Sequence, residues 1–353
     1  MEAFSNLSLI PAELDERYMW LALCQARKGL GKTSPNPAVG AVLVKDGEVL
    51  STGWHQRAGG PHAEIEALSA LERIEMAAGA TLYVTLEPCS TVGRTPPCTD
   101  AIIAGKIGRV VIGAIDPNPN HQGRGLERLR GAGITITTGV LEEEAGLLNV
   151  GFNKWITTGR PWIIAKVAQS LDSRITRPTG EPPRLSNDKS LRLVQHLRAT
   201  VDAILVGAET VRQDNPRLTV RTGSRHLQPW RVVVTRSGNL PREATILTDQ
   251  YQDRTLIYQR IAWQEVFEEL GAKGVTRLLV EGGGDILGQL RDLQLIDEIW
   301  CFITPLLTGG YKPSFGGEGV AQMGDATRLH RVRYKRIGDD VLVTGHTRHQ
   351  GDI

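Results

Sequence analysis

Three side chains that could bind one metal ion are spread along the chain, and they limit how residues 62 to 98 can fold. His62 comes first, and Cys89 and Cys98 follow it. One imidazole and two thiolates fill three of the four tetrahedral positions of Zn²⁺ and leave one open for water, as in catalytic rather than structural sites. The chain is therefore expected to bring these residues together around a zinc ion.

Glu64 lies two residues after His62 and adds a carboxylate that can move protons. Alone, a His-Glu pair often caps a helix, and a single cysteine is often a small buried hydrophobic residue. In this order, with Pro88 and Pro97 before the cysteines, the residues match the signature of zinc deaminases that act on nucleobases. We therefore expect hydrolytic deamination, with Glu64 as the catalytic residue and a water activated by zinc.

The length of 353 residues exceeds one typical hydrophobic core and indicates two domains, which we expect to span 1–150 and 151–353. The net charge of +2 and the lack of a long basic run argue against nucleic-acid and membrane surfaces and favour small-molecule substrates. Four cysteines, and an N-terminus without the pattern of a secretion signal, favour a cytoplasmic protein. We also expect a homo-oligomer.

The first half alternates helix and strand patterns. Asp46-Gly47 is typical of a type I′ turn between two strands, and Pro61 opens a helix with His62 and Glu64 in its first turn. Cys89 is expected just past a strand end and Cys98 on a loop. The expected helices are 15–28, one from 61 onward and 126–130, and the expected strands are 39–44, 48–54, 81–86, 110–114 and 134–138. This order predicts an α/β fold.

The loop between the two cysteines is eight residues long, Ser90 to Pro97, and the generic deaminase signature has a shorter spacer. Arg94 in this loop offers a guanidinium that matches the geometry of phosphate oxygens. A solvated arginine is the alternative reading. The longer loop is expected to help select the substrate.

A second α/β pattern follows a polar stretch, residues 149–159, that is expected to be a linker. Residues 278–285 combine a strand, three glycines and a helix start, so backbone amides there could approach a phosphate. A tight turn explains them equally well, and the spacing is not that of a Rossmann fold. The expected strands are 162–167, 203–207, 231–235, 255–258, 277–281 and 299–304, and the expected helices are 190–199 and 261–270.

Several short motifs surround the zinc pattern between residues 17 and 141. They are Pro35-Asn36-Pro37, Gly53-Trp54-His55, Pro61-His62-Ala63-Glu64, Leu86-Glu87-Pro88-Cys89, Gly93-Arg94-Thr95-Pro96-Pro97-Cys98 and Asp116-Pro117-Asn118-Pro119. With them, the region resembles the deaminase domain of the bifunctional riboflavin-biosynthesis deaminase/reductases, the RibD family. The resemblance implies a cytidine-deaminase-like three-layer fold, zinc at the three ligands and proton transfer by Glu64. The residues that it implies for contact with the pyrimidine or its ribose phosphate are Asn36, His55 and Arg94.

Residues 160 to 347 are similar to the reductase domain of the same family, a dihydrofolate-reductase-like α/β fold that uses NADPH. The motifs that carry the similarity are Lys166, Ser170-Leu171-Asp172, Leu197-Arg198, Ala203-Ile204-Leu205-Val206-Gly207, Thr210-Val211, Asp214 through Arg221 and Glu281-Gly282-Gly283. The implied substrate contacts are Pro182, Arg198, Leu218, Arg221 and Glu281. The implied cofactor contacts are Ala168, Arg184, Thr210, Asp214, Gly283, Gly284 and Asp285. Solvated charges are the alternative for the two substrate-binding arginines, and a turn residue is the alternative for Asp214.

The chain departs from the family pattern at three places. Thr91 stands where the family has a histidine after the Cys-Ser pair, and Ser173 stands where it has a glycine. Pro182-Pro183-Arg184 replaces a Ser-x-Trp segment whose serine meets substrate and whose tryptophan lies by the cofactor. These departures affect the substrate phosphate and the reductase more than the zinc chemistry.

We therefore expect a bifunctional enzyme of riboflavin synthesis that deaminates a diaminopyrimidine ribose phosphate with zinc and then reduces its ribose with NADPH. One alternative is a deaminase whose C-terminal half has lost redox activity and serves in binding or assembly, a reading that the Pro182-Pro183-Arg184 departure motivates. The other is a nucleic-acid editing deaminase. An aromatic content of 5% and a near-neutral charge argue against that last class.

Overall fold

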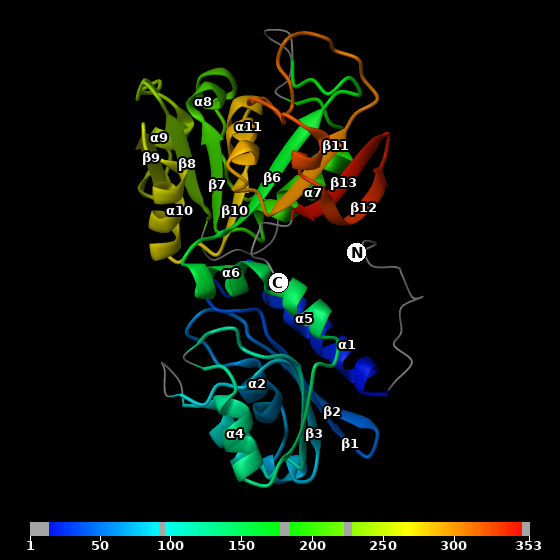
Figure 1. Ribbon diagram of the computed structural model, residues 1–353. Helices are drawn as coiled ribbons and strands as arrows, with labels where there is room; N and C mark the ends of the chain where they lie inside the picture. Colours follow the sequence, from blue (N-terminus) through cyan, green and yellow to red (C-terminus); the bar gives the residue numbers. More distant parts are fainter. Residues whose placement is uncertain (1–13, 92–95, 120, 177–183, 222–227, 348–353) are drawn as a thin grey trace. The chain divides into compact units, whose positions relative to one another are not determined.

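The computed structural model describes residues 14–91, 96–119, 121–176, 184–221 and 228–347. The chain forms two compact units, of which the first ends at Thr158 and the second begins at Gly159 (Figure 1). Both units are α/β, so the predicted fold class is confirmed. Among the described helices, none is both long and apolar enough to span a bilayer.

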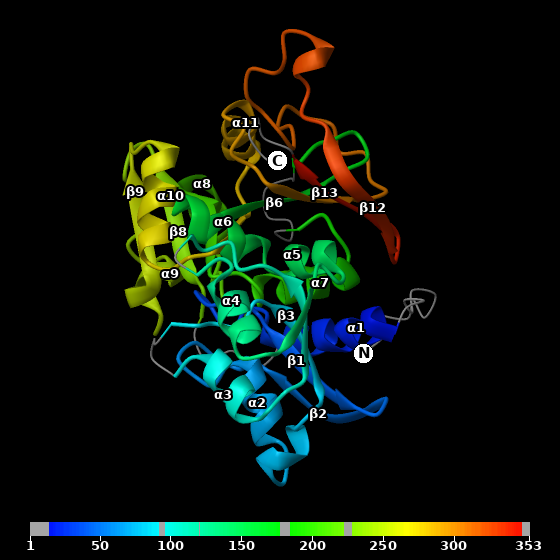
Figure 2. The ribbon, with the colours of Figure 1, turned by 60° about the horizontal axis from the view of Figure 1, so that its bottom comes forward.

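The first unit is a three-layer sandwich around a five-stranded sheet of order β2-β1-β3-β4-β5. β1 pairs antiparallel with β2 and β3, while β3, β4 and β5 are parallel. Helices α1 and α5 cover one face, and α2, α3 and α4 cover the other (Figure 2). The elements are α1 Leu14–Ala26, η1 Arg27–Gly29, β1 Gly40–Lys45, β2 Glu48–Trp54, α2 Ala63–Ser69, η2 Ile74–Ala77, β3 Thr81–Leu86, α3 Cys98–Ala104, β4 Arg109–Ala114, α4 Arg124–Gly131, β5 Thr135–Thr138, α5 Glu142–Leu148 and α6 Val150–Thr158.

Local sequence explains how α2 comes to lie where it does. Asp46 and Gly47 both have positive φ, 53° and 82°, as the predicted type I′ turn requires, and the turn aligns β2 with β1. A Cβ added to Gly53 on β2 would lie 2.2 Å from the carbonyl oxygen of Ala63. Only glycine therefore lets the first turn of α2 pack this closely on the sheet.

The predicted linker at residues 149–159 is wrong, because the segment is mostly the helix α6. Its polar side chains are satisfied locally: the hydroxyl groups of Thr157 and Thr158 donate to backbone carbonyls one turn earlier, at 2.8 and 2.7 Å. Asn149 before it is buried and exchanges two hydrogen bonds with the backbone of Ala38, at 2.8 and 3.0 Å. Polar composition here reflects packing and helix formation rather than a loop.

The second unit contains an eight-stranded sheet of order β12-β13-β11-β6-β10-β7-β8-β9. Strands β11, β6, β10, β7, β8 and β9 are parallel, and the β12–β13 hairpin adds an antiparallel edge. Helices α10 and α11 cover one face, and α7, α8 and α9 the other. The elements are β6 Trp162–Gln169, α7 Asp188–Arg198, β7 Ala203–Gly207, α8 Ala208–Asp214, β8 Trp230–Thr235, α9 Thr245–Thr248, η3 Gln252–Arg254, β9 Thr255–Gln259, α10 Trp263–Ala272, β10 Arg277–Val280, α11 Gly284–Asp292, β11 Glu298–Ile303, η4 Met323–Asp325, β12 Leu329–Ile337 and β13 Asp340–Thr347.

Candidate active sites

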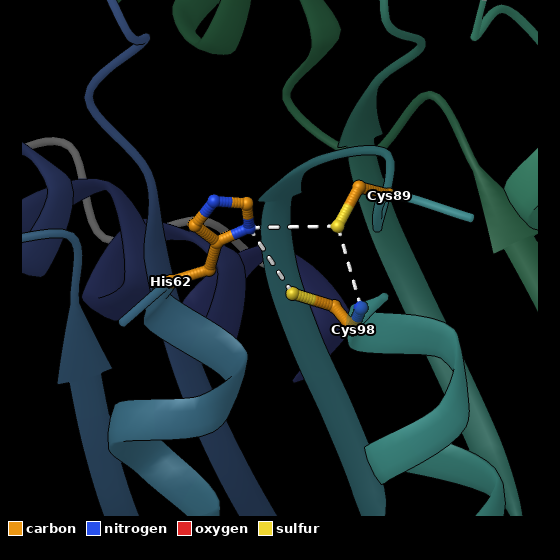
Figure 3. A group of neighbouring side chains, drawn as sticks. All are labelled: His62, Cys89 and Cys98. Atoms are coloured by element: carbon orange, nitrogen blue, oxygen red, sulfur yellow. Dashed lines mark hydrogen bonds between the residues drawn. The ribbon is translucent and has the colours of Figure 1, made fainter. Parts of the chain in front are cut away.

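The three expected metal ligands meet at the ends of three elements of the first unit. His62 is the N-cap residue of α2, Cys89 follows β3, and Cys98 begins α3. His62 Nδ1 lies 3.2 Å from Cys98 Sγ and 3.5 Å from Cys89 Sγ (Figure 3). Zn–N and Zn–S bonds of about 2.0 and 2.3 Å in a tetrahedron separate nitrogen and sulfur by about 3.5 Å. The donor set and its spacing therefore fit zinc.

The expected loop position of Cys98 is wrong, because Cys98 is the first residue of α3. Pro97 before it has φ −58°, and the buried Ile102 anchors the helix on the sheet. This start points the backbone N–H of Cys98 at Cys89 Sγ, at 3.3 Å. The backbone of Cys98 thus holds the thiol of Cys89 in position.

Without a metal, the two thiols share one proton: the hydrogen bond to Cys89 and burial raise the pKa of Cys98, so zinc has to displace the Cys98 proton when it binds. A hydrogen bond from the Cys98 thiol, assisted by His62, lowers the pKa of Cys89 to about 4, which favours the thiolate that a metal needs. Glu64, in the first turn of α2, is 3% exposed, and burial with the nearby Cys89 charge raises its pKa to about 7. A carboxyl that titrates near neutral pH can both accept and return a proton.

Asn36 and His55 form a chain of contacts that ends next to a zinc ligand. His55 Nδ1 donates to the carbonyl oxygen of Pro61 at 2.8 Å, and its Nε2 accepts from the amide of Asn36 at 3.1 Å. Burial lowers the pKa of His55, which agrees with this neutral form. Its ring meets that of His62 edge to face, with centroids 5.3 Å apart. Arg94, the third expected substrate residue, lies outside the described residues.

Glu87 was not predicted as a site residue from the sequence, yet it holds together two segments next to the zinc centre. Its buried carboxylate accepts backbone N–H groups from Asp116, Gly123 and Gly125, at 3.3, 3.0 and 3.0 Å. Since Glu87 precedes Pro88-Cys89, these bonds fix the loop after β4 against the turn that carries a ligand. Both segments carried recognisable motifs, but nothing in the sequence indicated that they touch.

In the second unit, two expected substrate residues bind each other. Arg198, the last residue of α7, donates two hydrogen bonds to Glu281, directly after β10, at 2.7 and 2.8 Å. Burial alone would raise the pKa of Glu281, but Arg198 and the charge of Lys166 on β6 lower it to about 2. Burial also lowers the pKa of Lys166, and the Glu281 carboxylate opposes this. These charges lie near the carboxyl ends of parallel strands, where ligands usually bind in α/β sheets.

The glycine turn between β10 and α11 forms as predicted, with Gly283 as the N-cap residue of the helix. A Cβ added to Gly284 would lie 2.2 Å from the carbonyl oxygen of Pro313, so this glycine serves packing. A Cβ added to Gly283 would meet no atom within 4 Å in the described part of the chain. The turn thus offers backbone N–H groups next to open space at a helix start, which fits a cofactor phosphate.

The other expected cofactor residues are distributed around this carboxyl edge. Ala168 lies in the last part of β6, and Thr210 and Asp214 lie on α8, which follows β7 directly. Asp285 in the first turn of α11 is exposed, 3.9 Å from a side-chain nitrogen of Arg236. Arg184 forms an ion pair of 2.5 Å with Asp188 at the start of α7.

Leu218 and Arg221 belong to the segment between α8 and β8. Leu218 is 2% exposed and has a φ of 51°, so its side chain packs in the core from a left-handed backbone. Arg221 is exposed, and its backbone N–H donates to Gln195 on α7 at 3.4 Å. Pro182, the remaining expected substrate residue, lies outside the described residues.

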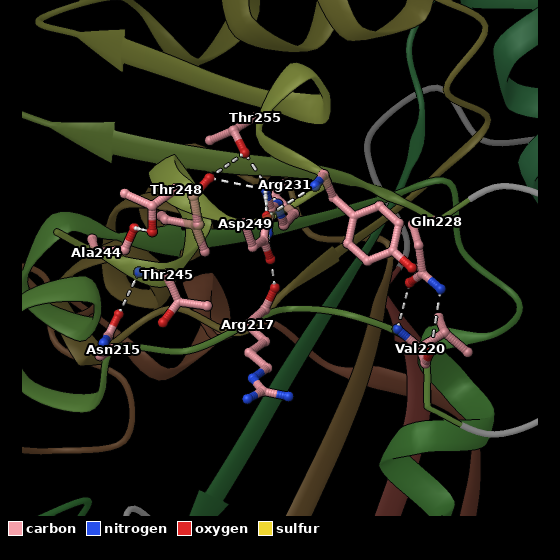
Figure 4. A network of polar contacts seen from close by, with 12 residues as sticks. Asn215, Arg217, Val220, Gln228, Arg231, Ala244, Thr245, Thr248, Asp249 and Thr255 are labelled. Carbon is pink, nitrogen blue, oxygen red and sulfur yellow. Dashed lines mark hydrogen bonds and ion pairs between the residues drawn. The ribbon is translucent and has the colours of Figure 1, made fainter. Parts of the chain in front are cut away.

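A polar network that the sequence did not predict holds this segment (Figure 4). Arg231 on β8 is buried, binds both carboxylate oxygens of Asp249 at 2.8 Å, and donates to the carbonyl oxygen of Arg217 at 3.3 Å. Gln228 bonds both backbone groups of Val220, at 2.8 and 3.2 Å. The network fixes the backbone on either side of Leu218.

Comparison with known proteins agrees with both halves. The family model of the cytidine and deoxycytidylate deaminase zinc-binding region matches residues 12–114, and that of the RibD C-terminal domain matches residues 161–343. The riboflavin biosynthesis protein RibD of Aquifex aeolicus is 39% identical, over 94% of this chain and 98% of its own length. RibD of Escherichia coli is 38% identical, over 93% and 98%.

Solved structures give the same result for the whole chain. Acinetobacter baumannii RibD superposes with a TM-score of 0.87 at 33% identity, covering 95% of this chain and 99% of its own. A Thermotoga maritima protein described as a diaminohydroxyphosphoribosylaminopyrimidine deaminase/5-amino-6-(5-phosphoribosylamino)uracil reductase gives 0.84 at 34% identity, with the same coverage. The chain therefore belongs to the RibD family of riboflavin biosynthesis enzymes, in which a zinc-binding deaminase domain is joined to an NADPH-dependent reductase domain.

Proposed function

We propose that the chain catalyses two consecutive steps of riboflavin biosynthesis. The first is hydrolytic deamination of 2,5-diamino-6-(ribosylamino)pyrimidinone 5′-phosphate, and the second is reduction of the ribose of 5-amino-6-(5-phosphoribosylamino)uracil. The Thermotoga maritima relative, described by these two activities, supports the substrates. The observation that carries the proposal is the convergence of His62, Cys89 and Cys98 beside the buried Glu64. We assign residues 1–150 to the deaminase and 151–353 to the reductase; the helix α6 lies at this boundary and belongs to the first compact unit.

In the deamination step, a zinc ion held by the three ligands would supply an activated water. Glu64 takes the proton of that water and passes it to the departing amino group, so that a C–N bond is replaced by a carbonyl and ammonia leaves. Asn36, held through its amide nitrogen by His55, orients the pyrimidine. Arg94 contacts the ribose phosphate. Holding the pyrimidine next to Glu64 in one site lowers the entropic cost of the reaction.

In the reduction step, bound NADPH would supply the hydride that reduces the carbonyl of the opened ribose. The backbone at Gly283 and the start of α11 would hold its phosphates, since helix N-termini attract anions. The other proposed cofactor contacts are Ala168, Arg184, Thr210, Asp214, Gly284 and Asp285. The proposed substrate contacts are Pro182, Arg198, Leu218, Arg221 and Glu281.

We further propose that the enzyme works in the cytoplasm as a homo-oligomer on small molecules and does not act on nucleic acid. The near-neutral net charge of +2 supports the last point, because nucleic-acid affinity depends on basic surfaces. Incubation with single-stranded oligonucleotides should release no ammonia.

The direct test is to incubate the zinc-loaded protein with the diaminopyrimidine ribose phosphate, to measure ammonia, and then to add NADPH and follow its absorbance. Ammonia release followed by NADPH oxidation is the expected result. Ammonia release without NADPH oxidation would contradict the reductase half and favour a C-terminal unit that only binds or assembles. Absence of ammonia would reject the deamination substrate.

A further inference from the structure

A histidine from a separate loop reaches the segment that follows the zinc ligand Cys89. His121 Nδ1 lies 3.1 Å from the hydroxyl oxygen of Thr91. Thr91 is two residues beyond Cys89, so the two Cα atoms are at most about 7 Å apart. The Thr91–His121 pair therefore lies at the rim of the zinc centre.

The loop that carries His121 is held in place from both ends. The Glu87 carboxylate binds the backbone of Asp116 and of Gly123, on either side of the histidine. Within the loop, the backbone N–H of His121 donates to the carbonyl oxygen of Asn118 at 2.9 Å. The side chain of His121 is thus presented by a built turn rather than by a free loop.

The chemistry of this pair suits an anion. One ring nitrogen of His121 contacts Thr91, and its Nε2 makes no hydrogen bond with any residue that the structure describes. The ring is half-buried. Asp116 interacts electrostatically with His121; its carboxylate also accepts the backbone N–H of Asn118 at 2.9 Å, and burial raises the pKa of this carboxyl.

Arg128 on α4 also contacts the segment that follows Cys89. It donates to the carbonyl oxygen of Ser90 at 3.5 Å and pairs with Asp100. We propose that His121, together with the Thr91 hydroxyl, binds the phosphate end of the deamination substrate and determines the preference for a phosphorylated nucleoside. This proposal rests on the proposed deaminase function. The family has a histidine at the position of Thr91. In this chain, the imidazole of His121 lies next to that position, although it comes from another loop.

The test compares deamination of the ribose phosphate substrate with that of its dephosphorylated form. A hydrogen bond to a charged group contributes about 1.5–3 kcal/mol, so His121→Ala should raise KM for the phosphorylated substrate by about tenfold to a hundredfold. Its kcat and its KM for the dephosphorylated form should stay near those of the wild type. Thr91→Val should shift the same KM in the same direction by less, and His121→Gln should recover part of the loss.

His196→Ala, at an exposed position of α7, is the matched control and should leave both KM values unchanged. An equal change for both substrates in His121→Ala, or loss of zinc or of thermal stability, would overturn the proposal in favour of a structural role. An unchanged KM ratio would also overturn it.

A binding measurement separates this proposal from the deaminase function. In full-length zinc-loaded protein, the imidazole NMR signal that is absent from His121→Ala is expected to shift on addition of ribose 5-phosphate but not of ribose. A shift in a protein that releases no ammonia would reject the proposed substrate reaction and keep the phosphate site. No shift would reject the phosphate site whatever the activity.

Discussion

The zinc centre and the reductase edge are built in different ways. The zinc centre gathers side chains from His62 to Cys98, each at the end of a helix or strand that fixes its direction. The proposed reductase site combines the backbone of a glycine turn with a buried ion pair whose partners, Arg198 and Glu281, are far apart in the chain. The identity of a few side chains therefore determines the zinc centre. The packing of the chain determines the other site, because that site consists of backbone groups and paired charges.

The largest expected effect comes from Glu64→Gln, which should nearly abolish one activity and leave the other unchanged. Glu64→Gln keeps the shape of the side chain and removes its basicity, so deamination should fall by about 10²–10⁴-fold with zinc content unchanged. NADPH oxidation with the deaminated intermediate should be unaffected. Glu66→Gln, on the same helix, is the control and should deaminate normally. A Glu64→Gln protein that deaminates at the wild-type rate would remove Glu64 from the mechanism.

Breaking the buried ion pair should affect the second unit alone. Arg198→Ala leaves Glu281 buried without its partner, which should lower the free energy of unfolding by about 3–5 kcal/mol in chemical denaturation. The double variant Arg198→Leu/Glu281→Leu should regain only part of this stability, because Lys166 then stays buried without the Glu281 carboxylate, and it should remain inactive as a reductase. Recovery of NADPH oxidation in the double variant would mean that the pair serves packing only.

The two glycines of the α11 turn offer a sharper contrast. Gly284→Ala forces a Cβ to within 2.2 Å of the Pro313 carbonyl oxygen and should cost stability, by about 1–3 kcal/mol. Gly283→Ala meets open space at a φ of −69° and should fold normally. If a cofactor phosphate approaches this backbone, Gly283→Ala should weaken NADPH binding by about tenfold in fluorescence titration, or about 1.4 kcal/mol. Unchanged binding would place the phosphate elsewhere.

The sequence predicts the zinc centre well because ligand types and spacing carry its chemistry directly. It predicts β3 and β7 with their observed bounds, since apolar runs of that length between turn signals indicate buried strands. It fails where polar residues are satisfied by tertiary contacts, as at Asn149 and the helix α6. It also leaves out Glu87 and Arg231, because a buried charged side chain becomes informative only once its distant partners are known.

Ser173 shows what a departure from the family pattern costs locally. It adopts a φ of 60°, the left-handed region that glycine enters freely, and the family has glycine there. A non-glycine residue loses about 1–2 kcal/mol in this region, partly offset by the greater unfolded-state entropy of glycine. Ser173→Gly should therefore raise the free energy of unfolding by about 0.5–1 kcal/mol. Ser237→Gly, where the native hydroxyl accepts the N–H of Asn239, should instead lower it. If Ser173→Gly lowered the free energy of unfolding, the backbone of Ser173 would not be strained.

The most direct test of the two-site account is to remove zinc from the full-length enzyme with a chelator and to assay both reactions in the same preparation. Ammonia release from the diaminopyrimidine substrate should be lost and should return when zinc is added back. NADPH oxidation with the deaminated intermediate should continue unchanged, because none of the zinc ligands belongs to the second unit. Loss of both activities on chelation would contradict the account, since it would mean that the reductase also depends on the zinc centre.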